Sequence, residues 1–431
     1  MKSPRHATVP HAPRRRAPGT GGARAAVAVV AVLAAAYVLS QFYRTSVGVI
    51  GPELMATLGL SASALGTLGG SYFLAFAVAQ VPVGVALDRF GPRRVSAVLL
   101  VVAALGAAVF AAAPDAGVLT LGRSLIGIGC AAGLMGALVV FSRWFEARRF
   151  STLAGLMLSV GGLGALVSTA PLAYAAAALG WRGAFLAAAA LTLAVAALVW
   201  LVVRDAPPGR AFHDRGRESV AEAARGVATV LGNRELHRLL PLNAVAYASV
   251  VAVLGLWGAP YLTDVHGLEA VDAGMVMMGM AVMLMAGSIS YGWLAPRLGG
   301  YKRPALAGAG GVAAIYAVLG LGLPLGLGAV AALLALAGLL GAYSVLLISH
   351  VRGLFPDHMV GRGLTAANLF NFGGVGLVQM ASGWIVDAWP ADAGAHPPAA
   401  YQALLWFLAA IIVLAALVYA RARDPLGEAP R

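Results

Sequence analysis

Two arginines lie inside long apolar stretches of the chain, Arg44 in the stretch from about residue 25 to 51 and Arg123 in that from about 117 to 141. An ionisable side chain inside hydrocarbon is costly to bury, and it usually serves a function. A guanidinium group in a medium of low dielectric constant suits a carboxylate or another oxyanion, which it holds through two parallel hydrogen bonds. The pair therefore predicts recognition of a small anion, unless either side chain reaches water or lipid headgroups from a helix end.

The composition excludes most classes of protein. Of 431 residues, 60% are hydrophobic and 11% are charged, whereas a soluble globular domain carries about 25% charged residues. A soluble enzyme, a secreted disulfide-bonded scaffold and a disordered chain are therefore excluded. The single cysteine, Cys130, lies in an apolar stretch, so the sequence holds neither a disulfide framework nor a cysteine-based metal site.

The apolar stretches are long enough to cross a bilayer, which takes about 20 residues per helix. They lie near residues 25–51, 61–87, 95–113, 117–141, 151–179, 182–203, 239–262, 271–295, 304–323, 325–350, 363–388 and 401–420. The predicted fold class is an all-α membrane protein with twelve transmembrane helices in two six-helix bundles.

The domain organisation follows from where polar residues interrupt this pattern. We expect a disordered basic cytoplasmic tail at 1–24, an N-terminal six-helix bundle at 25–203, a cytoplasmic linker at 204–238, a C-terminal six-helix bundle at 239–420 and a cytoplasmic tail at 421–431. Mixed charges at helical spacing within the linker predict a short amphipathic surface helix.

The positive charges are distributed very unevenly along the chain. If both termini are cytoplasmic, 27 of the 30 lysines and arginines fall on the cytoplasmic side, as the positive-inside rule requires. The net charge of +13 is therefore a signal of topology, with anionic lipid headgroups as the expected partner and nucleic acid excluded. The abundance of alanine and arginine over lysine indicates a GC-rich bacterial genome, hence a multi-pass protein of the inner (plasma) membrane.

A motif after the second helix is repeated after the eighth. The first copy runs from Gly84 to Arg94 with the pattern G-x-x-x-D-R-x-G-x-R-R, and the second runs from Gly292 to Arg303. The copies begin 208 residues apart, which is about half of the chain. Parallel halves of six helices, with the substrate site near the midplane between them, are one of the plans of secondary transporters.

The first copy resembles the first signature motif of the major facilitator superfamily, and the resemblance extends over essentially the whole chain. It implies that helices one, four, seven and ten line a central cavity, where Arg44 and Arg123 converge. It also implies that Asp88 contacts the start of helix eleven, near Gly363, and latches the cytoplasmic gate in the outward-open state. Arg123 is similar to the helix-four arginine that takes part in proton coupling in some members.

The residues of the motif have physical roles of their own. Gly84 permits a close approach of helices, Gly91 permits a positive φ, and a carboxylate at Asp88 complements the dipole of a neighbouring helix. The expected gate residues are Gly84, Asp88, Arg89, Gly91, Arg93, Arg94, Glu146, Arg297 and His350. A plain basic turn that only sets topology is the alternative, and Pro296 replaces the aspartate in the second copy, so the gate is expected to be asymmetric.

Further polar and aromatic residues on the expected cavity helices complete a candidate substrate site. Tyr37, Gln41 and Arg44 share one helical face. The whole predicted set is Tyr37, Gln41, Arg44, Arg123, Asn243, Tyr247, Trp257, Tyr343, Asn368, Asn371 and Gln379. Hydrogen bonds between helices are the alternative role of each. His350 titrates near neutral pH, but its place near the cytoplasmic end favours a gate or a solvated side chain.

The sequence contains no Walker-type phosphate loop, no H-E-x-x-H motif and no nucleophile–base pair. We therefore expect neither an enzyme nor a cofactor or metal site, and the methionines of helix eight read as adaptable packing. The predicted function is secondary active transport of a small, carboxylate-like organic anion by alternating access. We expect this transport to be coupled to protons and the protein to be a monomer. The alternatives are a proton-coupled exporter of drugs or amphiphiles, and a membrane receptor or scaffold built on a transporter fold.

Overall fold

The computed structural model describes residues 20–207, 219–294, 297, 300–391 and 395–424. The first half of the chain forms the helices α1 (Thr20–Leu58), α2 (Ala62–Phe90), α3 (Pro92–Ala112), α4 (Ala116–Cys130), α5 (Gly133–Trp144), α6 (Ala147–Val167) and α7 (Ala170–Val202). The second half forms α9 (Arg234–Ala252), the π-helical segment η1 (Val253–Trp257), α10 (Gly258–His266), α11 (Ala270–Leu294), α12 (Lys302–Gly320), α13 (Leu327–Gly341), α14 (Ser344–Gly353), α15 (Asp357–Asp387) and α16 (Pro398–Tyr419). Between them lies the short helix α8 (Val220–Val230).

These helices make twelve passes. Within the described residues, eleven helices are long and apolar enough to cross a membrane, and Thr152–Val167 is a shorter apolar helix. Eleven long helices correspond to twelve passes because α7 belongs to two of them: Gly180, with a φ of 69°, breaks α7 between the fifth and sixth passes. The fifth pass is α6 followed by the part of α7 before Gly180. The predicted twelve helices in two bundles are thus confirmed.

The ends of some helices differ from the expected ones. Helix α1 begins at Thr20 rather than at residue 25, and α15 begins at Asp357 rather than near Gly363. Apolar runs locate the hydrocarbon-embedded part of a helix, and backbone hydrogen bonding continues past it into polar residues. The rest of the predicted N-terminal tail lies outside the described residues.

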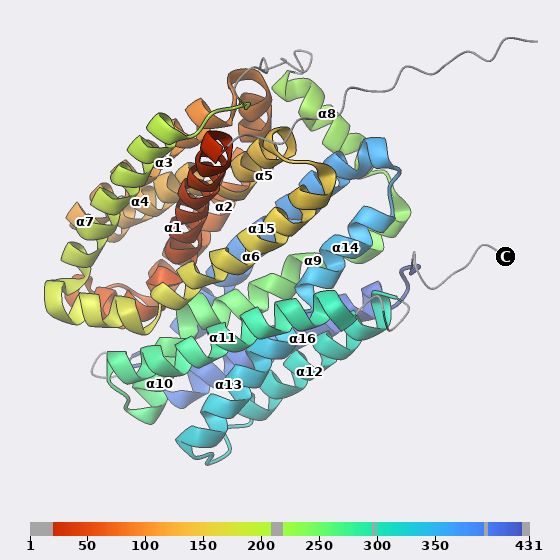
Figure 1. The fold of residues 1–431 in the computed structure, drawn as a ribbon. Coiled ribbons are helices and arrows are strands. Elements are labelled where there is room, and N and C mark those ends of the chain that lie inside the picture. Colours follow the sequence, from red (N-terminus) through yellow and green to blue (C-terminus); the bar gives the residue numbers. More distant parts are fainter. Residues whose placement is uncertain (1–19, 208–218, 295–296, 298–299, 392–394, 425–431) are drawn as a thin grey trace, which may run out of the picture.

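The two bundles, α1–α7 and α9–α16, lie side by side with α15 against the first bundle (Figure 1). We call the face that carries α8 and the end of α16 the termini face, and the other the opposite face (Figure 1). The described part of the linker contains the helix α8, whose Val227 and Val230 are buried, and the first residues of α9, which begins at Arg234 rather than at residue 239. Ser219 and Glu222 form a capping box at its start, and the backbone N–H of Ser219 holds the pKa of Glu222 below its usual value.

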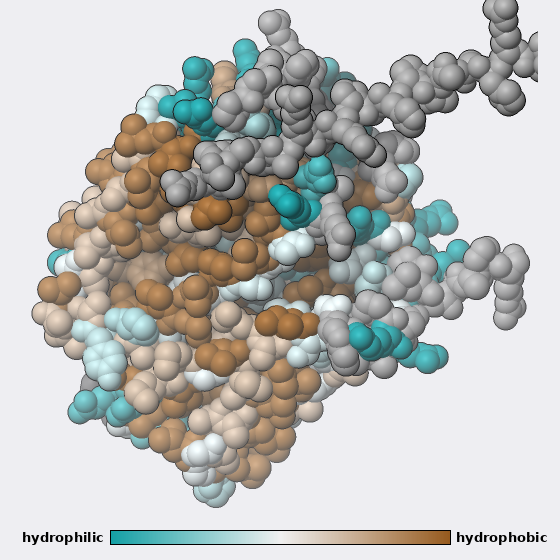
Figure 2. All heavy atoms as spheres, in the orientation of Figure 1, coloured by the Kyte–Doolittle hydropathy of each residue, from teal (hydrophilic) through white to brown (hydrophobic). Residues whose placement is uncertain are grey.

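The outer surface of both bundles is largely apolar in the view of Figure 2, and hydrophilic side chains gather near the termini face. Leu186, Leu201 and Leu414 are among the large hydrophobic side chains that are exposed. A soluble monomer rarely presents apolar patches on this scale. The surface therefore fits a lipid environment, in agreement with the length and hydropathy of the helices.

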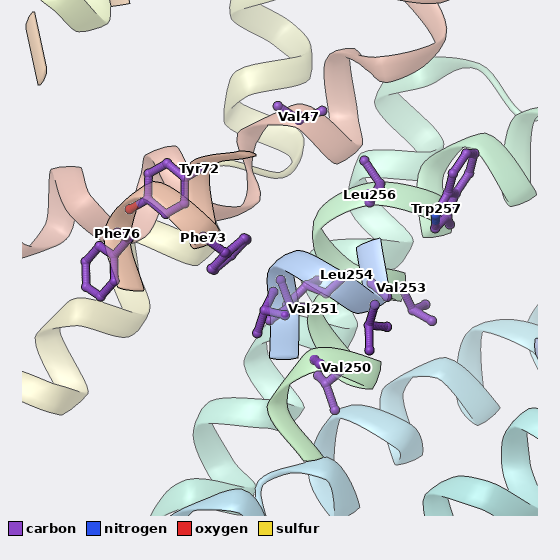
Figure 3. Packing of buried hydrophobic residues seen from close by; sticks show 14 of the residues in the cluster. Val47, Tyr72, Phe73, Phe76, Val250, Val251, Val253, Leu254, Leu256 and Trp257 are labelled. Atoms are coloured by element: carbon purple, nitrogen blue, oxygen red, sulfur yellow. The ribbon is translucent and has the colours of Figure 1, made fainter. Parts of the chain in front are cut away.

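The bundles meet through apolar side chains at the centre of the molecule. In Figure 3, Phe73 of α2 faces Val251 and Leu254 of the seventh pass, and these residues belong to one cluster of buried hydrophobic side chains. Trp257 is 1% exposed. This contact joins the second pass to the seventh, so the interface between the bundles is packed like the core of a domain.

Toward the opposite face the bundles meet along a seam of glycines, the glycine seam, formed by Gly48, Gly66 and Gly70 against Gly255, Gly376 and Gly383. A Cβ atom at Gly66 would lie 2.7 Å from the Cα atom of Gly383, and one at Gly48 would lie 2.6 Å from the backbone carbon of Gly255. Small residues permit such approach of helices in membranes. The opposite face is therefore closed in this structure.

Candidate functional site

Arg44 lies at the boundary between the two bundles. Its side chain is 7% exposed, and its Cζ atom lies 4.7 Å from the ring centroid of Phe76 on α2 and 4.8 Å from that of Phe372 on α15. The two rings contact each other edge to face at 4.6 Å, so they form a continuous aromatic floor against the guanidinium group. Such contacts attract a cation through the ring quadrupoles. The Arg44 side chain also shares a hydrogen bond with Tyr72, while its Nε atom is left without an acceptor.

Arg123 lies deeper in the first bundle and is fully buried. Its Nη1 atom donates a hydrogen bond of 2.6 Å to the backbone oxygen of Tyr43, next to Arg44 in the chain. Its Cζ atom lies 4.8 Å from the ring centroid of Tyr72. One donor of Arg123 is thus used to fix α4 against α1, and the Nε and Nη2 atoms have no hydrogen-bond partner. The Nε atom of Arg44 is also buried without one.

Several hydroxyl and thiol groups surround the two arginines. Tyr37, Tyr72 and Tyr247 lie near Arg44, and Cys130 lies near both arginines. Tyr72 lies near both arginines. Its hydroxyl group donates a hydrogen bond of 3.2 Å to the backbone oxygen of Ser40. These groups are neutral in their ordinary protonation states, so they do not offset the positive charge.

The described carboxylates lie far from this centre. Each is in a connecting segment or within two turns of a helix end. Glu53 is the one set furthest into a helix, and it accepts a hydrogen bond of 3.4 Å from the backbone N–H of Trp181 near the opposite face. An ion pair joins Arg238 to Glu235 at the start of α9, away from the two arginines. The two central arginines therefore form a positive site without a protein counter-charge.

Some predicted substrate residues gather at this site. Tyr37 and Tyr247 do so, and Tyr247 contacts the Phe372 ring at 6.4 Å. Gln41 is half-buried on α1, with its Oε1 atom unpartnered. Asn368 and Asn371 are half-buried on α15, four residues and one residue before Phe372.

Other predicted substrate residues hold helices together. Asn243 donates a hydrogen bond of 2.7 Å to the Ala367 oxygen, and Trp257 donates one of 2.7 Å to the Ser382 hydroxyl. Tyr343 is fully buried against Gly308 of α12. Gln379 is 1% exposed and lies against Gly69, within the interface that closes the opposite face. Contact of these four with substrate stays a prediction.

Tyr72, Phe76 and Phe372 were not among the residues predicted for the site. Tyr72 and Phe76 are four residues apart on one helix, a spacing that placed both on one face. Phe372 comes from the other half of the chain, so only the packing of α15 against α2 brings it to Arg44.

This architecture and the arginine pair can be compared with known proteins. The model of the Major Facilitator Superfamily matches residues 33–374, more than half of the chain. The chain belongs to the Major Facilitator Superfamily. It is a transporter of that superfamily and not an enzyme.

Two curated relatives match over shorter stretches. The nitrate/nitrite transporter NrtP of Picosynechococcus sp. is 34% identical over 110 residues, which are 26% of this chain and 20% of the relative. The probable sulfoacetate transporter SauU of Cupriavidus necator is 25% identical over 140 residues, which are 32% of this chain and 33% of the relative. The matches thus span about a third or less of either relative.

Solved structures of the superfamily share the fold over nearly the whole chain. A bacterial homologue of the human lysosomal transporter Spinster, inward-facing and occupied, has a TM-score of 0.73 at 19% identity and covers 94% of this chain and 97% of its own. A D-xylose–proton symporter has a TM-score of 0.71 at 18% identity, covering 94% and 99%. At this identity the likeness concerns the fold alone.

The superfamily motif lies at the termini face. Gly91 has the positive φ, 83°, that its place in the turn predicts. Asp88, Arg89 and Arg94 are exposed, and no atom lies within 4 Å of a Cβ built on Gly84. Because the latch at Asp88 is predicted for the state that opens on the opposite face, its exposure here fits a structure in which that face is closed, and the latch stays a prediction.

Arg93 of the motif is held by the last residues of the sixth pass. Its backbone N–H donates to Asp205 Oδ1 at 2.7 Å, and its Nε atom donates to the Trp200 oxygen at 2.7 Å. Trp144, at the end of α5, donates a hydrogen bond of 2.8 Å to the oxygen of Arg204. The end of the sixth pass thus ties the fourth pass to the start of α3.

The second half repeats this arrangement. The backbone N–H of Lys302 donates to Asp424 at 2.9 Å, and His350, fully buried at the end of α14, contacts the Arg423 oxygen and the Tyr419 hydroxyl at 2.8 Å each. His350 therefore fixes helices within one bundle. Of the other predicted gate residues, Glu146 is exposed at the start of α6, and Arg297 is exposed near the start of α12.

Asp88→Asn is expected to lower transport and to shift the protein toward states open on the termini face, because the neutral side chain complements a helix dipole less well. The helix-dipole interaction contributes roughly 0.3–1 kcal/mol, so we expect about a two- to five-fold change in the ratio of states. Rates of cysteine labelling at the two faces measure this ratio. Wild-type turnover and labelling in the variant would remove the latch from the account.

Proposed function

We propose that this transporter carries a small organic anion of the carboxylate kind, or a similar oxyanion, bound by Arg44 at the boundary between the bundles. The observation that carries the proposal is a pair of buried arginines with three unpartnered nitrogen atoms and no described carboxylate nearby. Buried charge requires a partner, and an anionic substrate provides one. A site at the junction of the bundles is also one that alternating access exposes to each side in turn.

The relatives support the same class of cargo. Nitrate, nitrite and sulfoacetate, which appear in the names of the two curated relatives, are small oxyanions. Planar or tetrahedral oxyanions match the fork of a guanidinium group. The relatives therefore favour a sulfonate or nitrate as a cargo as well as a carboxylate.

A proton-coupled exporter of drugs or amphiphiles is the rival within transport. Its cavity needs apolar surface and few fixed cations, whereas here two guanidinium groups lie at the centre. A receptor or scaffold on the same fold is the rival from another class, and it would show no reciprocal change in exposure between the two faces.

Symport with protons is the coupling that the sequence analysis predicts. It requires a group that binds a proton in one state and releases it in the other. The two groups considered there were Arg123 and His350, beside a proton carried by the substrate itself. Uptake driven by an imposed pH gradient tests this prediction.

The expected setting is the inner membrane of a bacterium, with both termini in the cytoplasm, anionic lipids around the basic termini face and a monomeric chain. Reporter tags at each end test the topology. Tags that report opposite sides would contradict it.

A thermal-shift screen of the purified protein tests the class of cargo. Ligands that bind the folded state raise its apparent stability, by about 2.7 kcal/mol at a hundredfold excess over the dissociation constant. We expect stabilisation by members of a panel of nitrate, sulfoacetate, acetate, glycolate and succinate, and none by xylose, nucleosides or organic cations. Stabilisation by the neutral or cationic compounds alone would refute the proposal.

A further inference from the structure

We infer that this transporter works as an anion exchanger: it moves one anion inward only when another moves outward, because the arginine site cannot pass through the membrane empty. The inference rests on the proposed function and adds its mode of coupling. It differs from the proton symport that the sequence predicts, and the charges around Arg44 and Arg123 carry it.

The site has a net positive charge that only cargo can offset. Tyr37, Tyr72 and Tyr247 near Arg44 are phenols, and the electrostatic neighbours of Arg123 are Tyr72, Tyr43 and Cys130. No carboxylate occurs among the neighbours of either arginine in the described part of the chain. A substrate with one or two negative charges is therefore the counter-ion of the site.

Both arginines are also buried in the closed arrangement. Arg44 is 7% exposed and Arg123 is not exposed, so little of either cation faces solvent when the glycine seam is closed. Taking a cation out of water without a partner is strongly unfavourable, whereas an anion held in good geometry offsets much of that cost. Occlusion is therefore favoured with an anion bound and disfavoured without one.

This difference decides the transport mode. A symporter must return empty after it releases its cargo, and the empty return would here carry two guanidinium groups without a counter-charge through the occluded state. An exchanger returns with a second anion, so it never meets that barrier. The transporter therefore changes between its two open states only with an anion bound, in either direction.

No group at the site is suited to replace the anion by changing its protonation. An arginine stays protonated in proteins, a tyrosine hydroxyl has an ordinary pKa of about 10, and a cysteine is only a few per cent thiolate at pH 7. His350, the buried histidine of the second bundle, is bound to Tyr419 and the Arg423 oxygen near the termini face. Protons therefore do not drive an empty return.

The test is uptake into proteoliposomes that contain either 10 mM unlabelled anion or none, at equal internal and external pH, with [35S]sulfoacetate and [15N]nitrate as the probes. We expect uptake of at least one probe to be about tenfold or more faster into the loaded vesicles. Imposing an alkaline lumen on the unloaded vesicles is expected to leave their slow uptake unchanged.

A substitution at Cys130 tests the reason for this behaviour. Cys130 is 2% exposed and interacts with both arginines, so Cys130→Asp places a carboxylate of similar size where the site lacks one. The variant is expected to take up the probe into unloaded vesicles, and an alkaline lumen is expected to accelerate that uptake, since the new carboxyl group can carry a proton. Cys130→Asn, which is matched in size and neutral, is expected to keep the wild-type ratio of loaded to unloaded uptake, whatever its absolute rate.

The outcomes separate the two proposals. Equal uptake by wild type into loaded and unloaded vesicles overturns exchange and leaves the anion transporter in place. Absence of uptake of both probes in either kind of vesicle contradicts the proposed function, and exchange with it. If Cys130→Asp is folded, as its elution and thermal midpoint report, and still requires a loaded lumen, the charge argument is wrong.

Discussion

Replacing Arg44 with glutamine is expected to lower anion uptake at least about 30-fold. Truncating one partner of a buried, hydrogen-bonded charge pair costs about 2 to 5 kcal/mol, and about 1.4 kcal/mol corresponds to a factor of ten. Arg44 is the central cation, since it touches both bundles through Phe76 and Phe372. Arg44→Lys keeps the charge but loses the planar fork, so its uptake should fall between those of wild type and Arg44→Gln.

The measurement is initial uptake of [35S]sulfoacetate and [15N]nitrate into proteoliposomes with anion inside. Arg182→Gln is the matched control, because Arg182 lies at the opposite face and donates to the oxygens of Ala111 and Ala113. That variant should transport within about twofold of wild type, as surface substitutions usually change little. Unchanged uptake in Arg44→Gln would remove Arg44 from the substrate site.

Gly383→Ala is expected to open the opposite face and to slow transport strongly. A Cβ atom at Gly383 would lie 2.7 Å from the Ala62 oxygen and 2.9 Å from the Cα atom of Gly66, so the bundles cannot close as they do here. Overpacking costs about 1–3 kcal/mol. Because the clash exists only in the closed arrangement, the state ratio should shift by about 5- to 150-fold.

A cysteine at position 62 measures this shift. Ala62 is fully buried in the closed arrangement, so Ala62→Cys, with Cys130→Ser as background, should react with a hydrophilic maleimide only when the glycine seam opens. Gly373→Ala is the matched control on the same helix, because no atom lies within 4 Å of a Cβ built there. Equal labelling of the Gly383→Ala and Gly373→Ala proteins would show that the seam does not control the opposite face.

The architecture could be predicted because it depends on local properties of the sequence. Apolar length located the twelve passes, and the turn at Gly180 fell between two predicted stretches. The asymmetry of basic residues predicted the topology, and the repeated motif predicted the division into two halves. The same reasoning identified Arg44 and Arg123, since a charge inside an apolar run is visible without any knowledge of packing.

The rest depends on contacts between distant parts of the chain. Phe372 reaches Arg44 only through the packing of α15 against α2. Asn243 and Trp257 carry the same donors that a substrate site needs, and only the structure reveals their partners, Ala367 and Ser382. The sequence therefore identifies the polar residues on a cavity helix. It does not show which of them contact substrate and which hold helices together.

The glycine seam illustrates the same limit. The chain has 55 glycines, and those of the seam are distinguished by what lies opposite them. Gly376 and Gly373 are neighbours on α15, yet a Cβ at Gly376 would meet Leu74 and the Gly70 oxygen while one at Gly373 would meet nothing within 4 Å. Helix pairing, and not glycine content, decides which of them matters.

The position of a bound anion tests the central claim most directly. Crystals grown with sulfoacetate, measured at a wavelength where sulfur scatters anomalously, would locate the sulfonate group. We expect a peak within hydrogen-bonding distance of the Arg44 guanidinium group, at the boundary between the bundles, and its loss in Arg44→Gln. A sulfonate bound elsewhere, with Arg44 still facing only its aromatic floor, would contradict the account.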